Sequence, residues 1–295
     1  MNRCIICGNT EFIPVYSGTL KKCLHCGFMT ANMEISDEIL KATYSVNYFR
    51  GEEYLDYLKD KEILQLNFEK RIRHIKKLVS GSLPVTNALE IGCAYGFFGE
   101  VLKRHFKTAY TGLDVVDEAV AYGREVLKLG LIKGDYQEMP GPVNLFSDVF
   151  LWDVIEHLPE PDKFLQKAYQ ELAPGGRIYI TTGDISALLP RIQGKNWRMI
   201  HPPSHIHYFT RKNLCRLIKA QGFSIAGWKY LPVYRSLRQV FYSLFLLNRK
   251  GGRLEKLLNR IPEKWNFPLN TFDIIFVMAE KPYTLLGFLM IFFFL

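Results

Sequence analysis

Four cysteines near the start of the chain form the most regular set of side chains that could do chemistry. They occur as two Cys-x-x-Cys pairs, Cys4 with Cys7 and Cys23 with Cys26, and a glycine follows each pair. Pairs at this spacing are typical of a zinc ribbon with four thiolate ligands, which has no open position for a substrate. A redox role is less favoured, because no βαβ pattern follows at once. The sequence therefore predicts a structural zinc ribbon over residues 1–35.

A second candidate site lies in residues 87–98. An apolar run that ends at Ile91 is followed by Gly92 and Gly96, and apolar residues then return at helical spacing. Strand, glycine turn and helix in this order are typical of a doubly wound sheet, where ligands bind beyond the strand's carboxyl end. Glu90 stands just before the turn, where its carboxylate would repel a phosphate and attract a cation. The pattern also lacks the dinucleotide fingerprint and the P-loop lysine.

Three further acids end or follow apolar runs of strand length. Asp114 closes one run, Asp153 closes another, and Asp135 follows a short run at Leu131 and Ile132. Such positions lie at the ligand-binding edge of a doubly wound sheet. Asp114 is placed there to accept hydrogen bonds from ribose hydroxyls.

The segment between Thr182 and Thr210 carries three histidines, His201, His205 and His207. They follow a predicted strand, on the side where a substrate would meet the ligand. Histidine titrates near neutral pH and can remove a proton from a hydroxyl or an activated carbon. The cluster therefore predicts a general base, and a metal site is the alternative.

Composition limits the class of protein. A length of 295 residues allows one sizeable α/β domain with an appendage, and 48% hydrophobic with 23% charged residues is typical of a globular chain. The net charge of +9 indicates an anionic partner, which is a nucleotide-linked substrate, a nucleic acid or a membrane surface. The start of the chain has no apolar signal segment, so we expect a reducing, cytoplasmic location.

The spacing of apolar residues and the positions of glycine and proline divide the rest of the chain into segments. Residues 36–82 contain an aromatic stretch and a long helix over about 56–79, and residues 83–282 alternate strands with helices. The apolar tail, residues 283–295, is too short to span a bilayer core of about 30 Å at 1.5 Å per residue.

Residues 233–269 are predicted to be a helical insertion. Its first part is apolar, and arginines and lysines follow directly. An apolar surface beside a cationic one suits the face of an anionic bilayer, so residues 233–260 and the tail are candidates for peripheral membrane contact. The alternative is an ordinary helical hairpin with a solvated basic side.

These motifs together resemble the class I S-adenosylmethionine-dependent methyltransferases. Glu90, Gly92 and Gly96 match the first motif of that family, and Asp114 matches its ribose-binding acid. The run Leu-Ala-Pro-Gly-Gly at residues 172–176 is very characteristic of the same class. The resemblance implies an α/β fold with a Rossmann-like, seven-stranded sheet whose last strand is antiparallel. It also implies S-adenosylmethionine as the cofactor.

The resemblance further implies which residues hold that cofactor. Glu90 and the glycine turn would orient its amino-acid part, Asp114 and Asp135 would hold the nucleoside, and Tyr136 would flank the adenine. A helical cap over residues 36–82 would cover the site, with Tyr44 and Tyr48 as candidates to line it. The full predicted set is Glu90, Gly92, Cys93, Gly96, Asp114, Asp135, Tyr136 and Asp153.

The ribbon and the histidine segment are similar to bacterial zinc-containing methyltransferases of deoxysugar and cell-surface glycan biosynthesis. Members that methylate sugar carbon carry His-Glu-His-x-x-Tyr-Phe, and alignment on Tyr208 places His205 on the second histidine but Ser204 on the glutamate. The resemblance implies His205 as the general base, with His207 or Tyr48 next. The implied acceptor is an oxygen or carbon of a nucleotide sugar, a surface polysaccharide or an isoprenoid-linked molecule.

Two other classes remain open from the sequence. A nucleic-acid methyltransferase would use the ribbon and the positive charge to bind phosphates, but the segment after Asp153 lacks the Asn/Asp-Pro-Pro-aromatic motif of typical amino-methylating enzymes. A non-catalytic membrane-associated scaffold would keep the fold without the cofactor, and the intact acids argue against it.

Overall fold

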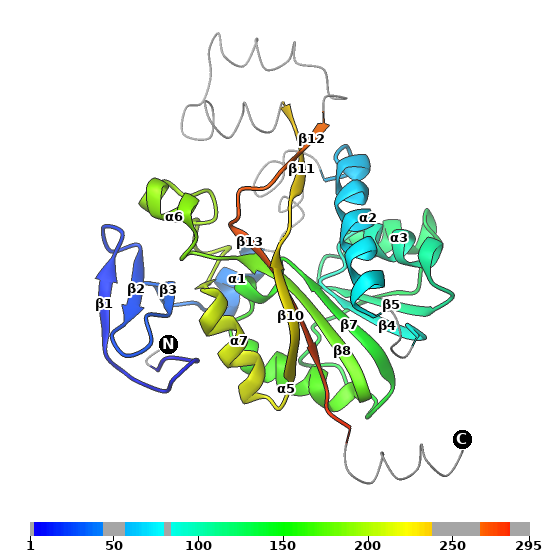
Figure 1. Cartoon of the computed structure of the whole chain (residues 1–295), viewed down its shortest axis with the longest axis horizontal. Coiled ribbons are helices and arrows are strands. Elements are labelled where there is room, and N and C mark those ends of the chain that lie inside the picture. The colour runs from blue at the N-terminus through cyan, green and yellow to red at the C-terminus, as the bar shows by residue number, and fades with distance from the viewer. Residues whose placement is uncertain (1–2, 44–56, 80–83, 238–265, 284–295) are drawn as a thin grey trace.

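Seven strands form one mixed sheet in the order β10-β13-β8-β7-β4-β5-β6 (Figure 1). The computed structural model describes residues 3–43, 57–79, 84–237 and 266–283. The strands are β4 Asn87–Ile91, β5 Ala109–Asp114, β6 Leu131–Lys133, β7 Phe146–Trp152, β8 Leu172–Gly183, β10 Ser224–Tyr230 and β13 Ile274–Glu280. Strand β13 runs antiparallel to both of its neighbours, β8 and β10. The predicted methyltransferase-type sheet with an antiparallel last strand is therefore confirmed.

Helices cover both faces of this sheet (Figure 1). One face packs against α2 (Lys61–Leu78), α3 (Phe97–His105) and α4 (Asp117–Glu125), and the other against α5 (Pro161–Glu171) and α7 (Arg211–Ala220). Shorter elements are α1 Asp37–Thr43, α6 Leu188–Gln193, and the 3₁₀ helices η2 Ile155–His157 and η3 Gly194–Asn196.

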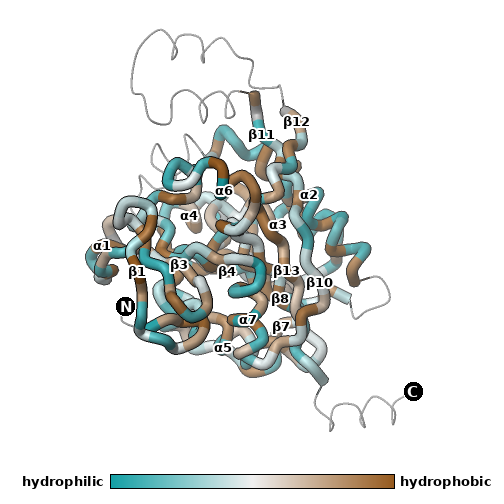
Figure 2. The backbone as a smooth tube through the Cα atoms, turned by 60° about the vertical axis from the view of Figure 1, so that its left-hand side comes forward, coloured by the Kyte–Doolittle hydropathy of each residue, from teal (hydrophilic) through white to brown (hydrophobic). Residues whose placement is uncertain are grey.

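The pleat of the central strands explains the two-sided core. Along β7, Phe150 and Trp152 belong to the core beneath α2 and α3, whereas Val149 and Leu151 belong to the core beneath α5 and α7. Successive side chains of a strand point to opposite faces, so a strand buried on both sides must be apolar throughout. The hydropathy of the backbone follows this rule, with apolar residues along the inner strands (Figure 2).

The predicted ribbon segment joins a second, four-stranded sheet. Its strands β1 (Phe12–Val15), β2 (Leu20–Cys23) and β3 (Met29–Ala31) form a meander, and β3 pairs with β9 (His207–Tyr208). The sequence did not predict this pairing. It places the N-terminal segment directly against the histidine-rich segment.

Several element boundaries differ from those predicted. Helix α2 begins at Lys61 rather than near residue 56, because Leu58 to Asp60 form a turn closed by a bond from Lys61 N to Leu58 O. Helix α4 ends at Glu125, and the chain then reverses through a positive φ at Lys128. The Pro-Gly-Gly segment lies inside β8 as an irregularity.

The described ends of the predicted helical insertion are strands. Strand β11 (Val233–Ser236) pairs antiparallel with β12 (Asn266–Leu269). Residues 238–265 of the insertion, residues 284–295 of the apolar tail, Tyr44 and Tyr48 lie outside the described residues. Among the helices that the structure describes, none has the length and apolar character needed to cross a bilayer.

A buried ion pair links two central strands. Arg177 of β8 donates from Nε and Nη2 to the carboxylate of Asp148 on β7 at 2.8 and 3.0 Å, and Tyr179 Oη donates to the same carboxylate at 2.9 Å. The side chains of Asp148 and Arg177 are 0% and 2% exposed. Removing one partner of such a pair leaves a buried charge without compensation.

We therefore expect Arg177→Met to lower the free energy of unfolding by about 3–5 kcal/mol. Urea denaturation followed by circular dichroism measures the change. Lys163→Met is the control, because Lys163 and Glu160 form an exposed ion pair whose loss should leave the midpoint unchanged. An unchanged midpoint for Arg177→Met would contradict this account of the pair.

Candidate active site

The turn after β4 has a backbone that only glycine fits well. Gly92 has a φ of +70°, and a Cβ added there would lie 2.5 Å from Val154 Cγ2. The amides of Gly92 and Cys93 both donate to Leu113 O, at 2.8 and 3.0 Å. These bonds hold the turn against the end of β5 and bring the backbone to the edge where a ligand binds.

Asp114 is fixed by the same turn. Its Oδ2 accepts a bond of 2.7 Å from Ala94 N, and its Oδ1 accepts a bond of 2.9 Å from Val116 N. Burial raises the pKa of Asp114, and these backbone donors oppose the rise by favouring the ionised form. A carboxylate held in this way can accept further hydrogen bonds from a bound ligand.

Glu90 lies beneath the turn rather than at its surface. Its side chain is 2% exposed and accepts a hydrogen bond from the hydroxyl of Tyr110. Burial raises the pKa of Glu90 well above its usual value. This burial does not favour the predicted direct contact between Glu90 and a cationic ligand. The hydrogen bond with Tyr110 holds Glu90 beneath the turn, where its side chain supports the turn.

A cavity of about 670 Å³ opens at the carboxyl ends of β4, β5 and β7. This volume lies within the range of about 300–1,000 Å³ that is common for small-molecule sites. Five residues of the predicted cofactor set line it, namely Gly92, Asp114, Asp135, Tyr136 and Asp153.

The other predicted cofactor residues lie behind the cavity wall. Cys93 is 3% exposed, with its Sγ 3.7 Å from Ala94 O. Gly96 begins α3 in a left-handed conformation, where an added Cβ would meet Leu129. Both residues shape the turn and do not line the cavity.

Two lining residues also bond to the protein itself, and the roles that the resemblance implies for them stay predictions. Tyr136 donates its hydroxyl to Glu171 at 2.7 Å, and the residue lines the cavity. Asp135 is exposed, and its Oδ1 accepts a bond from Gln137 N.

Residues that the sequence analysis missed complete the wall. Tyr57 stacks against Tyr95 and Phe97, and it lines the cavity together with Trp152. Arg71 of α2 donates to Asp153 Oδ2 at 2.9 Å. Arg71 interrupts the apolar stripe of its helix, and a charged residue on a buried face was the available signal.

Two histidines meet beside this cavity. His157 lines it, and His205 lies behind His157 with the ring centres 4.5 Å apart. His157 Nδ1 is 2.8 Å from Ser204 O, and His205 Nδ1 is 2.9 Å from Met199 O. A carbonyl at Nδ1 favours the tautomer with the proton on Nδ1, and the ring of His157 has a further hydrogen bond to the backbone of Asp153. The ring of His201 is tilted against that of His205, with the ring centres 3.9 Å apart.

Burial keeps both rings neutral. It lowers the pKa of His157 to about 4 and lowers the pKa of His205 well below its usual value. Neutral imidazoles can accept a proton or coordinate a metal ion. One ligand atom each of Glu156, His157 and His205 lie within 4.8 Å of one another, so this trio could also hold a divalent cation.

His207 has a different place from His205. Its Nδ1 is 3.1 Å from Thr30 Oγ1 of β3, and its Nε2 is 3.4 Å from Pro159 O. The ring is 1% exposed and does not line the cavity. Its two contacts connect the N-terminal sheet to the segment after η2. This position away from the cavity does not favour His207, the predicted alternative to His205, as the general base.

The four N-terminal cysteines converge. Cys4 Sγ is 3.5 Å from Cys26 Sγ, Cys7 Sγ is 3.6 Å from Cys23 Sγ, and all four sulfur atoms lie within 4.8 Å of one another. Zinc–sulfur bonds of about 2.3 Å in a tetrahedron place the sulfur atoms about 3.8 Å apart. The donor set and its spacing therefore fit a tetrahedral thiolate site.

Comparison with known proteins identifies the family. A family profile described as a methyltransferase domain matches residues 52–226, which is more than half of the chain, and the protein belongs to this family. Together with the fold, this defines a class I S-adenosylmethionine-dependent methyltransferase.

Individual relatives share less than a third of their residues with this chain over the aligned segments. The chain is 29% identical over 170 residues to a ubiquinone biosynthesis O-methyltransferase of Aeromonas salmonicida, covering 52% of this chain and 71% of the relative. It is 27% identical over 113 residues to the cycloartenol-C-24-methyltransferase of Arabidopsis thaliana, and this match covers 36% of this chain and 34% of the relative.

Solved structures support the fold. A methyltransferase from Archaeoglobus fulgidus, named as dependent on S-adenosylmethionine, matches with a TM-score of 0.51 and 19% identity, covering 76% of this chain and 99% of that one. The [4+2]-cyclase SpnF matches with a TM-score of 0.50 and 17% identity, and the match covers 72% of this chain and 81% of SpnF. The same fold thus carries different chemistries.

The residues present fit S-adenosylmethionine. The cavity has a suitable volume, and both the carboxylate-bearing Asp114 and Gly92 of the turn line it. Asp153 lines the cavity as well, and its buried Oδ1 has no hydrogen-bond partner among the described residues.

We expect Asp114→Ala to weaken S-adenosylmethionine binding by about tenfold to a hundredfold, because it removes charge-assisted hydrogen bonds of about 1.5–3 kcal/mol. Isothermal titration calorimetry measures the affinity, and circular dichroism checks the fold. Asp117→Ala is the control, since Asp117 is an exposed acid three residues further along. Unchanged affinity in Asp114→Ala would remove Asp114 from the binding site.

Proposed function

We propose that this enzyme transfers a methyl group to a hydroxyl oxygen of a small acceptor, and that the His157–His205 pair receives the proton. The observation that carries the proposal is the neutral, buried histidine pair at the wall of the cavity. Relatives named as O-methyltransferases match over 71% of their length, which supports oxygen as the methylated atom.

The structure favours His157 over His205, the predicted general base, as the residue nearest the acceptor. His157 lines the cavity, whereas His205 contacts the cavity only through His157. We therefore place His157 as the first proton acceptor and His205 as the residue that positions it. Tyr48, the other predicted catalytic residue, lies outside the described residues.

S-adenosylmethionine supplies a methyl group on positively charged sulfur. The acceptor oxygen bonds to that carbon as the carbon–sulfur bond breaks, the electron pair of the broken bond stays on sulfur, and the hydroxyl proton passes to the neutral imidazole of His157. Gly92 and Asp114 bind and orient the donor, and Tyr57 and Trp152 exclude water. Holding two reactants in line can remove about 7–11 kcal/mol of a bimolecular barrier.

For the acceptor, we propose a nucleotide sugar, a surface glycan or an isoprenoid-linked molecule. The support is the sequence resemblance at the ribbon and at Tyr208, together with relatives whose names specify ubiquinone and sterol biosynthesis. The positive charge of the chain agrees with an acceptor that carries phosphate.

We expect His157→Gln and His205→Gln each to lower turnover by about 10²–10⁴-fold, the usual range for loss of general base catalysis, while leaving the affinity for S-adenosylmethionine unchanged. Transfer of labelled methyl to a panel of nucleotide sugars, glycans and isoprenoid-linked molecules measures turnover. His25→Gln, at an exposed position, is the control. Full activity in His157→Gln would refute the proposal, and full activity in His205→Gln would refute the positioning role of His205.

Two further measurements distinguish a general base from a metal site at Glu156, His157 and His205. If His157 is the base, turnover should hold as pH falls until pH nears its pKa of about 4, where protonation removes the lone pair. If Glu156, His157 and His205 instead hold a metal ion, a chelator should abolish turnover and an added divalent ion should restore it.

We also propose that Cys4, Cys7, Cys23 and Cys26 bind one structural zinc ion. The support is their convergence and the pairing of β3 with β9, through which the ion would stabilise the histidine segment. Structural zinc contributes directly to folding free energy.

Elemental analysis of the purified protein should find about one zinc per chain, and Cys26→Ser should lower this content strongly. Cys215→Ser is the control, because Cys215 lies on α7, apart from the cluster. Zinc content that is equal in the two variants would contradict the assignment.

A further inference from the structure

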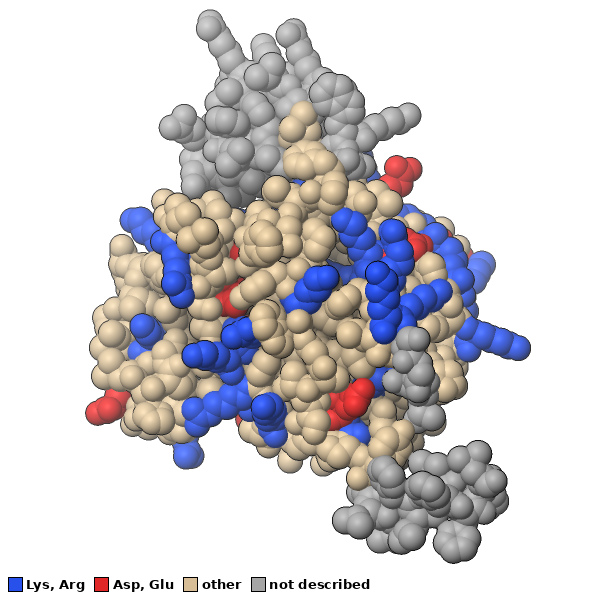
Figure 3. All heavy atoms as spheres, in the orientation of Figure 1, with Lys and Arg blue, Asp and Glu red and all other residues tan. Residues whose placement is uncertain are grey.

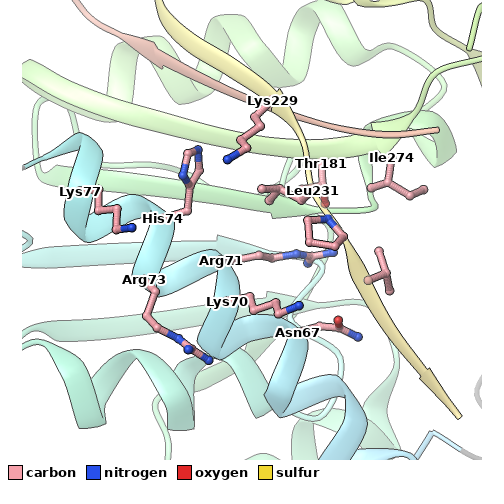
Figure 4. A pocket seen from close by; sticks show the side chains of 12 residues that line it. Asn67, Lys70, Arg71, Arg73, His74, Lys77, Thr181, Lys229, Leu231 and Ile274 are labelled. Atoms are coloured by element: carbon pink, nitrogen blue, oxygen red, sulfur yellow. The ribbon is translucent and has the colours of Figure 1, made fainter. Parts of the chain in front are cut away.

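A basic groove lies between α2 and the strand β10. Its volume is about 270 Å³, below the usual range of about 300–1,000 Å³ for a site that encloses a drug-sized ligand. The groove is therefore sized for one chemical group of a larger molecule. The cationic residues that line it are Lys70, Arg71, Arg73, Lys77 and Lys229, together with His74 (Figure 4).

These cations come from two separate elements. Lys70, Arg73 and Lys77 lie on one face of α2, because residues three, four and seven positions apart are neighbours on a helix. Lys229 extends toward them from β10 (Figure 4). Lysines and arginines also gather over this part of the molecular surface (Figure 3).

The positive charge of the groove is poorly compensated. No acid is among its described lining residues, and only Arg71 has a carboxylate partner, Asp153. Lys70 Nζ lies 4.0 Å from the ring centre of Tyr234. Lys77 and Lys229 have no ion pair with any described residue. Like charges three or four positions apart destabilise a helix, so a bound anion would relieve this repulsion.

The groove also adjoins the cavity of the active site. Arg71 lines the groove, and its guanidinium binds Asp153, which lines the cavity. Thr181, another groove residue, accepts a bond from Asp153 N at its Oγ1. The ion pair of Arg71 and Asp153 therefore lies between the groove and the cavity.

We propose that this groove binds the phosphate or diphosphate group of the acceptor. Lysine ammonium groups and arginine guanidinium groups are the usual partners of phosphate oxygens. The inference rests on the proposed methyl transfer in assigning the anion to the acceptor. The lowered pKa of His74, caused by burial and then by Lys229 and Lys77, agrees with a positive potential in the groove.

The test is calorimetric titration of the full chain with inorganic pyrophosphate, at saturating S-adenosylmethionine. We expect binding that Lys77→Gln/Lys229→Gln weakens at least about tenfold. The matched control is Lys103→Gln/Lys212→Gln, which removes the same charge from exposed positions on α3 and α7 and should change affinity less than about twofold. Equal weakening in both double variants would show a general charge effect and overturn the proposal.

Further arms identify the source of the diphosphate. We expect UDP, farnesyl diphosphate or both to bind with the same dependence on Lys77 and Lys229. Binding of UDP would indicate a nucleotide-sugar acceptor, and binding of farnesyl diphosphate would indicate an isoprenoid-linked acceptor. Binding of anionic phospholipid vesicles alone, without pyrophosphate, would overturn the proposal. Competition between pyrophosphate and S-adenosylmethionine would also overturn it, because it would place the anion in the cofactor cavity.

Failure of the two proposals is distinguishable. If S-adenosylmethionine binds and methyl transfer is measured but pyrophosphate does not bind, only the groove assignment fails. If the chain binds pyrophosphate at the groove but no S-adenosylmethionine, the methyl-transfer proposal fails, and with it the link between the anion and the acceptor.

Discussion

The contact between the glycine turn and the end of β5 is the constraint on which the site depends. Amides of the turn donate to Leu113 O and to the carboxylate of Asp114, so two neighbouring strands end at a fixed spacing. Any side chain at Gly92 would push the turn away from Val154 and loosen this edge. Under the proposed function, these short backbone bonds would set the position of the methyl donor.

The acceptor side is held by a different part of the chain. Strand β3 pairs with β9, and Thr30 contacts His207, so the cysteine-bearing segment holds the residues that follow His205. Phe28 packs against Phe209 in the same place. Under the proposed function, the N-terminal sheet would therefore position the histidine segment, and the four cysteines would have a structural role.

Local patterns predicted the sheet and the cavity edge, because strand, glycine turn and helix are encoded by neighbouring residues. They placed Asp114 and Asp153 correctly at that edge. The pairing of β3 with β9 and the ion pair of Arg71 with Asp153 join residues far apart in the chain, and spacing contains no signal for such contacts. Sequence favoured His205 as the general base, and packing shows that His157 lines the cavity whereas His205 does not.

The most direct test of the account is a crystal structure of the full chain with S-adenosylhomocysteine. The account predicts ribose hydroxyls on the carboxylate of Asp114, the amino-acid part against the turn at Gly92, and the sulfur directed toward the side of the cavity that His157 lines. A complex in which the ligand lies elsewhere, or in which its sulfur is directed away from His157, would contradict the central claim.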